Sequence, residues 1–503
     1  MRWGSGRVRF AVACAASAVV VGPLVWLWQA SLLPQAYPVT GMGYPDRGGG
    51  PAAGVMAQGG VMAQGGHGAH PMPGRSVTSL TADPARPADV AVTLTARRQR
   101  FRLPSGRAVD GYTLNGASPG PVIRASVGQL VQVRLVNESV PDGVTLHWHG
   151  VDVPAAADGV AGVTQDQVGV GRVFIYRFVA ERAGTFWYHS HQISHQQVSG
   201  GLLGALLVTP AQPATGVVDV LALVHRYHGV GTVNGGEGDT PVVVQPGGRA
   251  RLRVINTDNG PMSTWVAGAP FRLVAVDGTD LTAPTPIQDT AVLVTAGGRA
   301  DLEVAMPADG SPVRVHLGGS GALVLGATSH HAPTVPKPHT TLDLLSYGTT
   351  APLPFNPDTP QRRFRYDIGR RPGFLNGRPG IWWTINGHLF PNVPMYIVAD
   401  GDVVRMHITN HSGEVHPMHL HGHHAIVLNR NGIPATGSPW WIDSLNVGNG
   451  ETYDIAFLAN NPGIWTDHCH NLPHATQGLT THLMYEGITT PFTVGGTPGN
   501  QPE

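Results

Sequence analysis

The sequence contains little cysteine and little charge. Two cysteines among 503 residues cannot build a disulfide framework, and one of them, Cys14, lies inside an apolar run. Charged side chains make up 13% of the chain, about half the usual share of a soluble domain, and 32 basic residues balance 32 acidic ones. A chain without net charge and without a basic tract lacks the electrostatic surface that binds nucleic acid, so we expect no nucleic-acid partner.

Glycine, proline and histidine are abundant instead. The 67 glycines and 43 prolines separate short β-branched runs from about residue 88 onward, a pattern typical of an all-β protein with closely spaced turns. The 25 histidines far outnumber the two cysteines. Cys469, flanked by His468 and His470, is therefore the one thiol outside the apolar run, and its surroundings need an explanation.

The N-terminus is built for export. Residues 10–34 are almost wholly apolar and follow Arg2, Arg7 and Arg9, which is typical of a helix that spans a membrane and places the rest of the chain outside. A cleaved signal peptide is the alternative interpretation of residues 1–34, and it would release the protein by secretion. Either way we expect an extracytoplasmic protein, and the anchor at the cell membrane is favoured.

A segment rich in glycine, proline and methionine follows at residues 35–87. It repeats VMAQGG at 55–60 and 61–66, cannot bury a core, and is predicted to be a disordered tether. Thioether and imidazole groups suit cuprous ion, so a copper-catching tether is one interpretation and a plain spacer the favoured one. The side chains concerned are Met56, Met62, His67, His70 and Met72.

Three copies of one β module make up the remainder. An Asn-Gly turn precedes an extended stretch, which is followed by a glycine and, nine residues later, an asparagine. The strands VQVRLV, RARLRVI and VVRMHIT lie between these pairs, which are Gly128 and Asn137, Gly247 and Asn256, and Gly401 and Asn410. We therefore predict three sandwiches of roughly 130 residues each, at 88–212, 213–350 and 351–495, before a tail at 496–503.

Modules one and three carry matching histidine pairs that module two lacks. HWHG at 147–150 corresponds to HLHG at 419–422, and GTFWYHSH at 184–191 corresponds to GIWTDHCH at 463–470. On a strand, alternate side chains share a face, so each His-x-His pair projects two imidazoles in one direction. We expect the two modules to face each other across a multinuclear metal site, with module two as a spacer.

Cys469 narrows the choice of metal. Imidazole-rich sites suit copper, zinc, iron or nickel, but a thiolate with two imidazoles is the trigonal donor set of a blue-copper centre. The thiol of Cys469 points away from the faces of His468 and His470, where His416 and His474 are available. The peptide from Cys469 to its two neighbours would then be a short electron path between two sites.

The stretches HWHG (147–150), HSH (189–191), HPMHLHG (416–422) and HCHNLPHATQGL (468–479) closely resemble those of three-domain multicopper oxidases of the laccase type. The resemblance covers nearly everything after the tether. It implies three cupredoxin-like Greek-key sandwiches and four copper ions: one type 1, one type 2 and a type 3 pair. It assigns His416, Cys469 and His474 to type 1, His147 and His419 to type 2, and His149, His189, His191, His421, His468 and His470 to type 3.

Two further residues take their roles from the same resemblance. Leu479 stands ten positions after Cys469, where the family places its axial residue, so we expect a three-coordinate type 1 copper with a raised potential. Asp158 resembles the family's acid near the type 2 copper and is predicted to donate protons, with a turn-capping role as the alternative. Asp443 and Asp467 are weaker candidates with a structural role favoured.

Other residues near the motifs receive plainer interpretations. Trp187 and Tyr188 are predicted to pack against the cluster. The remaining nearby histidines are predicted to support the ligands or lie at the surface; they are His195, His225, His228, His423 and His424.

The resemblance implies an enzyme that takes single electrons from a small phenol or aromatic amine at type 1 and reduces dioxygen to water at the cluster. A cuprous, ferrous or manganous oxidase in copper homeostasis is the alternative, although module three has no long Met-rich insertion. A non-catalytic copper-binding protein would be expected to have lost ligands, and none is missing here. The third module excludes a two-module nitrite reductase.

Overall fold

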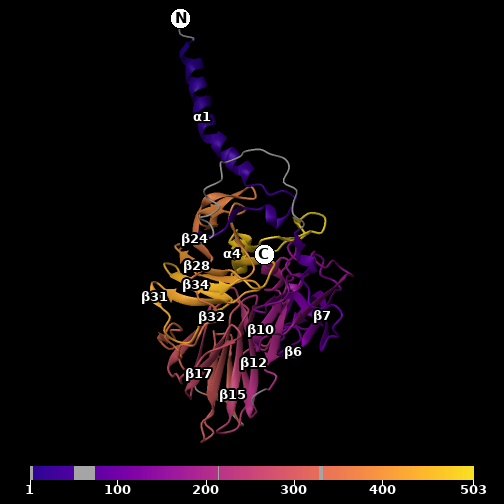
Figure 1. Ribbon diagram of the computed structural model, residues 1–503, viewed down its shortest axis with the longest axis vertical. Helices are drawn as coiled ribbons and strands as arrows, with labels where there is room; N and C mark the ends of the chain where they lie inside the picture. Colours follow the sequence, from indigo (N-terminus) through magenta and orange to yellow (C-terminus); the bar gives the residue numbers. More distant parts are fainter. Residues whose placement is uncertain (1–3, 50–73, 213–214, 328–331, 333, 503) are drawn as a thin grey trace.

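The computed structural model describes residues 4–49, 74–212, 215–327, 332 and 334–502. Among these residues the prediction of an all-β protein is confirmed: three modules, each of two packed sheets, follow a single long helix. Figure 1 shows modules one and three side by side beneath this helix, with module two at the opposite end of the molecule. The exact module boundaries stay a prediction.

Module one packs two four-stranded sheets face to face. In the first, the order β6-β11-β10-β8 joins Ile123–Ser126, Leu203–Thr209, Gly184–His189 and His147–His149. In the second, the order β5-β4-β7-β9 joins Ala108–Leu114, Val90–Arg102, Leu130–Asn137 and Val173–Val179. Strand β8 lies at an edge of its sheet, which leaves its histidines free to face another module.

Module two has two six-stranded sheets. The order β13-β12-β15-β20-β17-β18 joins Val230–Val233, Val217–Tyr227, Arg249–Asn256, Arg299–Ala305, Phe271–Val276 and Thr279–Asp280. The order β14-β22-β21-β16-β19-β23 joins Asp239–Val243, Ala322–Gly326, Val313–Leu317, Met262–Ala267, Thr290–Val294 and Thr340–Thr341. Its apolar side chains form a core of their own, centred on residues such as Leu252 and Leu302.

Module three is the largest. The order β2-β27-β36-β35-β29-β33 joins Tyr44–Asp46, Pro394–Val398, Thr480–Tyr485, Ile464–Cys469, His416–Leu420 and Ser444–Val447. The order β26-β25-β24-β28-β34-β30-β31 joins His388–Leu389, Arg378–Ile385, Arg362–Leu375, Val403–Asn410, Thr452–Leu458, Ala425–Arg430 and Ile433–Pro434, and β32 (Trp441–Ile442) pairs with β30. Short helices α3 (Ser194–Gln197) and α4 (Leu472–Thr476) follow the histidine strands of modules one and three.

The repeated asparagine has the same structural role in each module. The three predicted strands are β7, β15 and β28, and each ends at its asparagine: Asn137, Asn256 or Asn410. Every one of these buried side chains donates its amide hydrogens to two or more loop carbonyls, for example those of Val140 and Val168. Buried backbone carbonyls need such partners, which explains why the sequence signal repeats.

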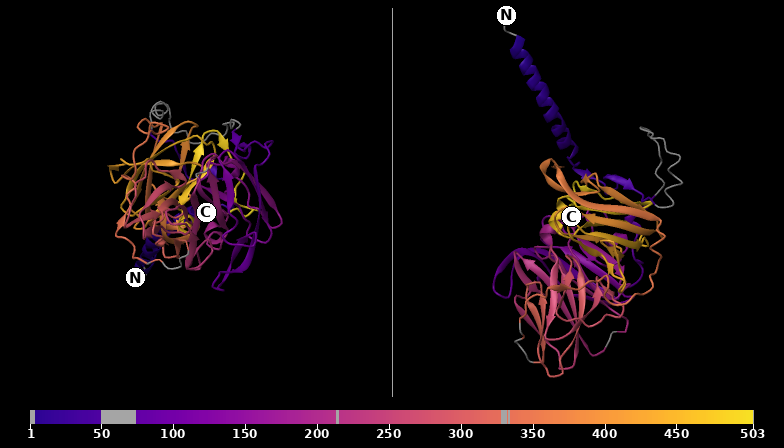
Figure 2. Two further views of the ribbon diagram at one scale, coloured as in Figure 1. Left: turned by 90° about the horizontal axis from the view of Figure 1, so that it is seen from below. Right: turned by 90° about the vertical axis from the view of Figure 1, so that its left-hand side faces the viewer.

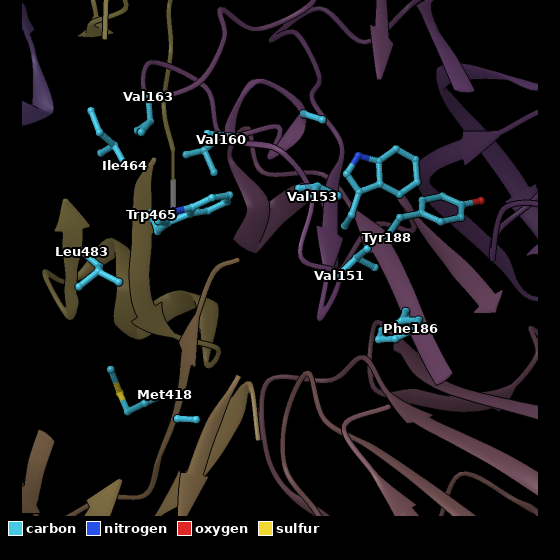
Figure 3. Packing of buried hydrophobic residues seen from close by; sticks show 14 of the residues in the cluster. Val151, Val153, Val160, Val163, Phe186, Tyr188, Met418, Ile464, Trp465 and Leu483 are labelled. Atoms are coloured by element: carbon cyan, nitrogen blue, oxygen red, sulfur yellow. The ribbon is translucent and has the colours of Figure 1, made fainter. Parts of the chain in front are cut away.

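Modules one and three share one hydrophobic core. Figure 3 shows Val160 and Val163 of module one beside Ile464 and Trp465 of module three, all of them buried. A core that crosses the module boundary fixes the two faces against each other, because separating them would return this apolar surface to water.

The N-terminal helix α1 (Gly4–Ala30) extends away from the body, as Figure 1 and the right-hand view of Figure 2 show. Its stretch from Val8 to Ala30 is long and apolar enough to cross a membrane and is not buried in the protein. The chain meets the rest of the protein just after the C-terminal end of α1. There the backbone amide of Gly377 donates a hydrogen bond to Ser31 Oγ at 3.1 Å.

The prediction of a free tether is wrong for the described parts of residues 35–87. Strand β1 (Ala36–Tyr37) pairs with β38 (Val494–Gly495), β2 joins module three, and β3 (Arg75–Ser76) pairs with β37 (Ile488–Thr489). Turns η1 (Val39–Gly41) and η2 (Val77–Ser79) bury Val39 and Val77. The overall composition of residues 35–87 did not indicate that these few apolar residues would anchor the segment to the modules. The predicted copper-catching residues from Met56 to Met72 lie outside the described residues.

Candidate metal centre

Strand register brings the histidines of module one together. In β8 the chain alternates, so Trp148 points into the core against Tyr176 while His147 and His149 point to the other face. The antiparallel pairing with β10 sets His147 opposite His189 and His149 opposite Trp187. His191 follows β10 directly and is fully buried.

The same arrangement recurs in module three. Strands β29 and β35 pair antiparallel, with His419 opposite His468 and Met418 opposite Cys469. The imidazoles of the two modules then stack across the boundary. The ring centroids of His147 and His421, and those of His149 and His419, are 3.7 Å apart. The predicted meeting of modules one and three is therefore present in the structure.

Cys469 faces two imidazole nitrogens. Its Sγ lies 3.6 Å from His416 Nδ1 and 3.7 Å from His474 Nδ1, and the two nitrogens are 3.2 Å apart. The other ring nitrogen of His416 is held by Ser412 Oγ at 2.7 Å, which leaves Nδ1 free for a metal. Burial raises the pKa of the Cys469 thiol, so a stable thiolate here needs a bound cation. Leu479 is also fully buried and offers no donor atom.

The other eight predicted histidines form three compact groups. Within each group the candidate ligand atoms lie within 4.8 Å of one another. The first group is His149, His189 and His470, and the second is His191, His421 and His468. The third group is His147, His149 and His419, so His149 belongs to both the first and the third. His468 and His470 thus belong to different groups, although both are bonded to Cys469.

Buried imidazole nitrogens without partners test whether a metal fits. Nδ1 of His147, His189, His419, His421 and His468 contacts an oxygen of the protein at 2.8–3.1 Å, which orients Nε2 toward the group. Among the described side chains, Nε2 of His189, Nδ1 of His149 and both ring nitrogens of His191 and His470 are buried without a hydrogen bond. Such groups are costly unless something binds them. Copper, which favours imidazole, satisfies them.

Asp158 joins two of the groups. One carboxylate oxygen is 3.1 Å from His147 Nδ1 and the other is 3.1 Å from His421 Nδ1. The residue ends the turn η3 (Ala155–Ala157) and is completely buried, and burial raises its pKa. Asp467 is buried as well, and burial raises its pKa to about 8.

Module two contributes more than the predicted spacer. Arg299 of β20 holds Asp443 through two contacts of 2.5 and 2.6 Å, and Asp443 Oδ1 lies 3.1 Å from His149 Nε2. Burial would raise the pKa of Asp443, but the charge of Arg299 keeps it well below its usual range. Sequence reasoning missed Arg299, since nothing near it in the chain resembles a site.

Gly297 is the second contribution of module two. A Cβ atom there would lie 2.8 Å from His149 and 2.9 Å from His470, and the backbone φ of +77° disfavours other residues. Its carbonyl also accepts a hydrogen bond from Trp187 Nε1 at 3.0 Å. In the sequence, the one feature that could have indicated this contact is the glycine just before the strand that carries Arg299.

The remaining predicted neighbours divide into two sets. Trp187 packs on His149 and His189, as expected, but Tyr188 points into the core of module one, where its hydroxyl donates to the carbonyl of Pro121. The prediction for Tyr188 is wrong because its strand neighbour Trp187 occupies the face toward the cluster. His424 contacts Asp152 and Asp443 and so supports the site indirectly.

Comparison with known proteins agrees with this geometry. Two family models, both described as multicopper oxidase, match the chain, one at residues 96–213 and the other at 355–487. The chain belongs to the multicopper oxidase family. It is 26% identical over 456 residues to Laccase-1 of Botryotinia fuckeliana, covering 76% of this chain and 79% of that protein. It is 26% identical to the multicopper oxidase MmcO of Mycobacterium tuberculosis, covering 80% of this chain and 89% of that protein.

The fold is likewise that of known multicopper oxidases. The crystal structure of a multicopper oxidase from Pseudomonas thermotolerans aligns with a TM-score of 0.63 and 26% identity, covering 79% of this chain and all of that one. The three sandwiches are therefore cupredoxin-like, as the motifs implied. As a laccase-like multicopper oxidase, the chain is an oxidoreductase that binds four copper ions and uses dioxygen as its acceptor.

Proposed function

We propose that this multicopper oxidase oxidises small phenols or aromatic amines at His416, Cys469 and His474 and reduces dioxygen to water at the histidine cluster. The observation that carries the proposal is the position of Cys469. Its thiol faces His416 and His474, while its two chain neighbours enter separate groups of buried histidines. We assign His147 and His419 to type 2 copper, and His149, His189, His191, His421, His468 and His470 to type 3.

The protein's contribution is to position donors and exclude water. Copper, when bound, supplies the single-electron chemistry that these side chains lack. His474 is the type 1 donor nearest the surface, so a reductant can approach it without entering the cluster. The peptide from Cys469 to His468 and His470 links the two sites covalently. The cluster itself is closed, since its histidines are at most 1% exposed.

An organic reductant fits the surroundings of His474 better than a metal ion does. The carboxylate beside it belongs to Glu414, 3.6 Å from His474 Nε2. Arg370 lies 3.5 Å from the same carboxylate and offsets its charge, whereas a site for ferrous or manganous ion needs unpaired carboxylates. A turnover on cuprous or ferrous ion far above that on phenols would contradict this part of the proposal.

The copper-loaded chain should be blue and consume dioxygen with a phenol or a diamine. Cys469→Ser removes the thiolate while keeping a side chain of similar size, so we expect loss of both colour and turnover with an unchanged fold by circular dichroism. A blue and active Cys469→Ser protein would overturn the assignment. Ser190→Ala, which leaves every proposed ligand in place, is the matched control and should stay blue.

We propose that Asp158 delivers protons to dioxygen, because its carboxylate contacts both His147 and His421, which belong to different groups. Asp158→Asn keeps the shape without the acid. Dioxygen reduction should fall by roughly a hundredfold, while reduction of the blue site under nitrogen stays at the wild-type rate. Restored turnover in Asp158→Glu would support the role, and an unchanged Asp158→Asn enzyme would exclude it.

Helix α1 is consistent with export, and we propose that it stays attached as a cell-membrane anchor. Its apolar length and the preceding arginines support this placement. The full chain should remain in the membrane fraction after carbonate extraction, with the N-terminal residues detected by mass spectrometry. A soluble protein that begins after residue 30 would show cleavage instead.

A further inference from the structure

A cavity of about 790 Å³ lies against helix α4, which carries His474. It is lined mainly by four parts of the chain: the segment that leaves α1, the hairpin of β24 and β25, α4 with the residues after it, and the C-terminal residues from Val494 to Pro502. We call it the α4 cavity. Its lining includes Gln35, Tyr37, Leu375, Trp382, Ala475 and Gln477.

The wall of the α4 cavity is connected to the type 1 donors. Gln477 in the wall accepts a hydrogen bond from Trp383 Nε1 at 3.0 Å. The Trp383 ring centroid lies 4.7 Å from that of His416 and 4.6 Å from that of His474. A molecule in the cavity is thus separated from the two imidazoles by one layer of side chains.

The lining suits an organic ring and not a metal cation. Its described residues include the aromatic side chains of Tyr37, Trp382 and Phe390 and the amides of Gln35 and Gln477. Arg378 is the charged side chain among them, and these described lining residues include no carboxylate, thiol, thioether or imidazole. Aromatic walls with a few amides are typical of sites for neutral ring compounds that carry hydroxyl groups.

The cavity also lies at the end of the molecule that α1 leaves. Asn376, at the turn of the β24–β25 hairpin, donates its amide to the carbonyl of Ser31 at 3.1 Å. Figure 1 shows α1, β24 and α4 together at this end, with module two at the other. Ile381 on the hairpin is 67% exposed, and Arg371 and Arg378 nearby are exposed cations. Apolar and cationic side chains of this kind suit a surface of anionic lipid.

We propose that the α4 cavity binds an amphiphilic hydroquinone or phenol that enters from the bilayer. The inference rests on the proposed function and on the proposed anchor. Two hydroquinones lose four electrons and four protons and become two quinones. One dioxygen, the oxidant of the proposed function, takes these electrons and protons and becomes two waters.

A second cavity next to α4 provides an internal control. It has a volume of about 560 Å³ and lies between module two and the residues after α3 in module one. Asn259 Oδ1 of module two accepts the amide hydrogen of Leu472 at 3.4 Å. Its lining includes the ionisable side chains of His225, Arg226 and Asp258. This cavity is charged, and no residue of the segment after α1 lines it, so it suits water-soluble compounds and filling it should not affect a bilayer-dissolved substrate.

The test uses the full copper-loaded chain in vesicles of phosphatidylcholine and phosphatidylglycerol. The probes are a hydroquinone with a ten-carbon alkyl chain, held in the bilayer, and water-soluble phenylenediamine. Gln35→Trp fills the α4 cavity and Gln35→Ala enlarges it; Ser199→Trp fills the control cavity. We expect Gln35→Trp to raise KM for the hydroquinone roughly tenfold with kcat, blue absorbance and diamine turnover unchanged.

Each other result has a defined meaning. Ser199→Trp should leave KM for the hydroquinone near the wild-type value, and Gln35→Ala should raise it less than Gln35→Trp does, because it removes one amide but blocks no space. An unchanged hydroquinone KM in Gln35→Trp, or equal changes for both probes, would overturn the cavity inference while diamine turnover still supports the proposed function. If the blue wild-type chain oxidises neither probe, the proposed function fails. Gln35→Ala reports whether a loss in Gln35→Trp comes from misfolding, because the smaller side chain removes bulk at the same position.

Discussion

At the scale of single residues, Leu479 sets the character of the proposed type 1 site by offering no donor. It is fully buried in the core shared by modules one and three, and its carbonyl accepts the amide hydrogen of Cys469 at 3.0 Å. The Leu479 side chain therefore fills the core and, for the same reason, leaves the proposed type 1 site without an axial ligand. Donors that favour the oxidised ion lower a copper potential, so their absence favours a high one.

Leu479→Met places a thioether where the leucine is now. The swap nearly conserves volume, so the free energy of unfolding should change by less than ~1.5 kcal/mol. We expect the type 1 reduction potential to fall, measured by redox titration of the blue absorbance. Leu483→Met, another buried position of the same core, is the control and should leave the potential unchanged. Equal potentials in both variants would refute an axial role for position 479.

Gly297→Ala tests the close approach of module two to the cluster. The added Cβ would meet His149 and His470 at under 3 Å, and backbone there cannot move freely at positive φ. We expect dioxygen consumption to fall by roughly 10–100-fold while the blue absorbance remains. Gly319→Ala, also at positive φ but with nothing near its Cβ, should keep full turnover. A fully active Gly297→Ala enzyme would show that the turn yields easily.

At the scale of elements, strand periodicity explains what the sequence could predict. His147 and His149 share a face because they are two residues apart on a strand, and the same holds for the pairs in β29 and at the end of β35. The spacing therefore located all the grouped histidines. It could not locate Arg299 or Gly297, because their contacts depend on how module two docks, which no local pattern encodes. The same limit applies to the anchoring contacts of Val39 and Val77.

The segment between α1 and residue 49 offers a prediction about these anchoring contacts. Removal of residues 1–30 should give a blue, stable, water-soluble enzyme, since the stretch of α1 from Val8 to Ala30 is exposed. Removal of residues 1–49 also takes away β1, β2 and the buried Val39 and Met42, and should cost roughly 2–5 kcal/mol of unfolding free energy. Denaturant titration of both truncated proteins measures the difference. Equal midpoints would show that the segment only rests on the surface.

At the scale of the whole molecule, the three modules form two units, defined by the hydrophobic cores and by the proposed ligands. Modules one and three share a core and hold every proposed ligand between them, while module two has a core of its own. Bound copper should therefore stabilise the first unit and leave the second nearly unaffected.

Removal of copper by a chelator should lower one thermal transition and spare the other. Each site occupied at a hundredfold excess over its Kd adds about 2.7 kcal/mol to the stability of the unit that holds it. Scanning calorimetry with and without copper is the measurement. Cys469→Ser, which lacks one proposed site, should fall between the two. A uniform shift of both transitions would mean that module two melts with the others.

The core shared by modules one and three also sets the timing of biosynthesis. Ribosomes deliver residues 147–191 long before residues 416–474, and domains generally begin to fold as they emerge. The apolar face of module one that packs against module three therefore stays exposed while all of module two is synthesised. The histidines of module one gain the last of their partners, His468 and His470, only when β35 and the residue after it have left the ribosome. Metal loading is therefore a late event in the life of the chain, after translation has ended.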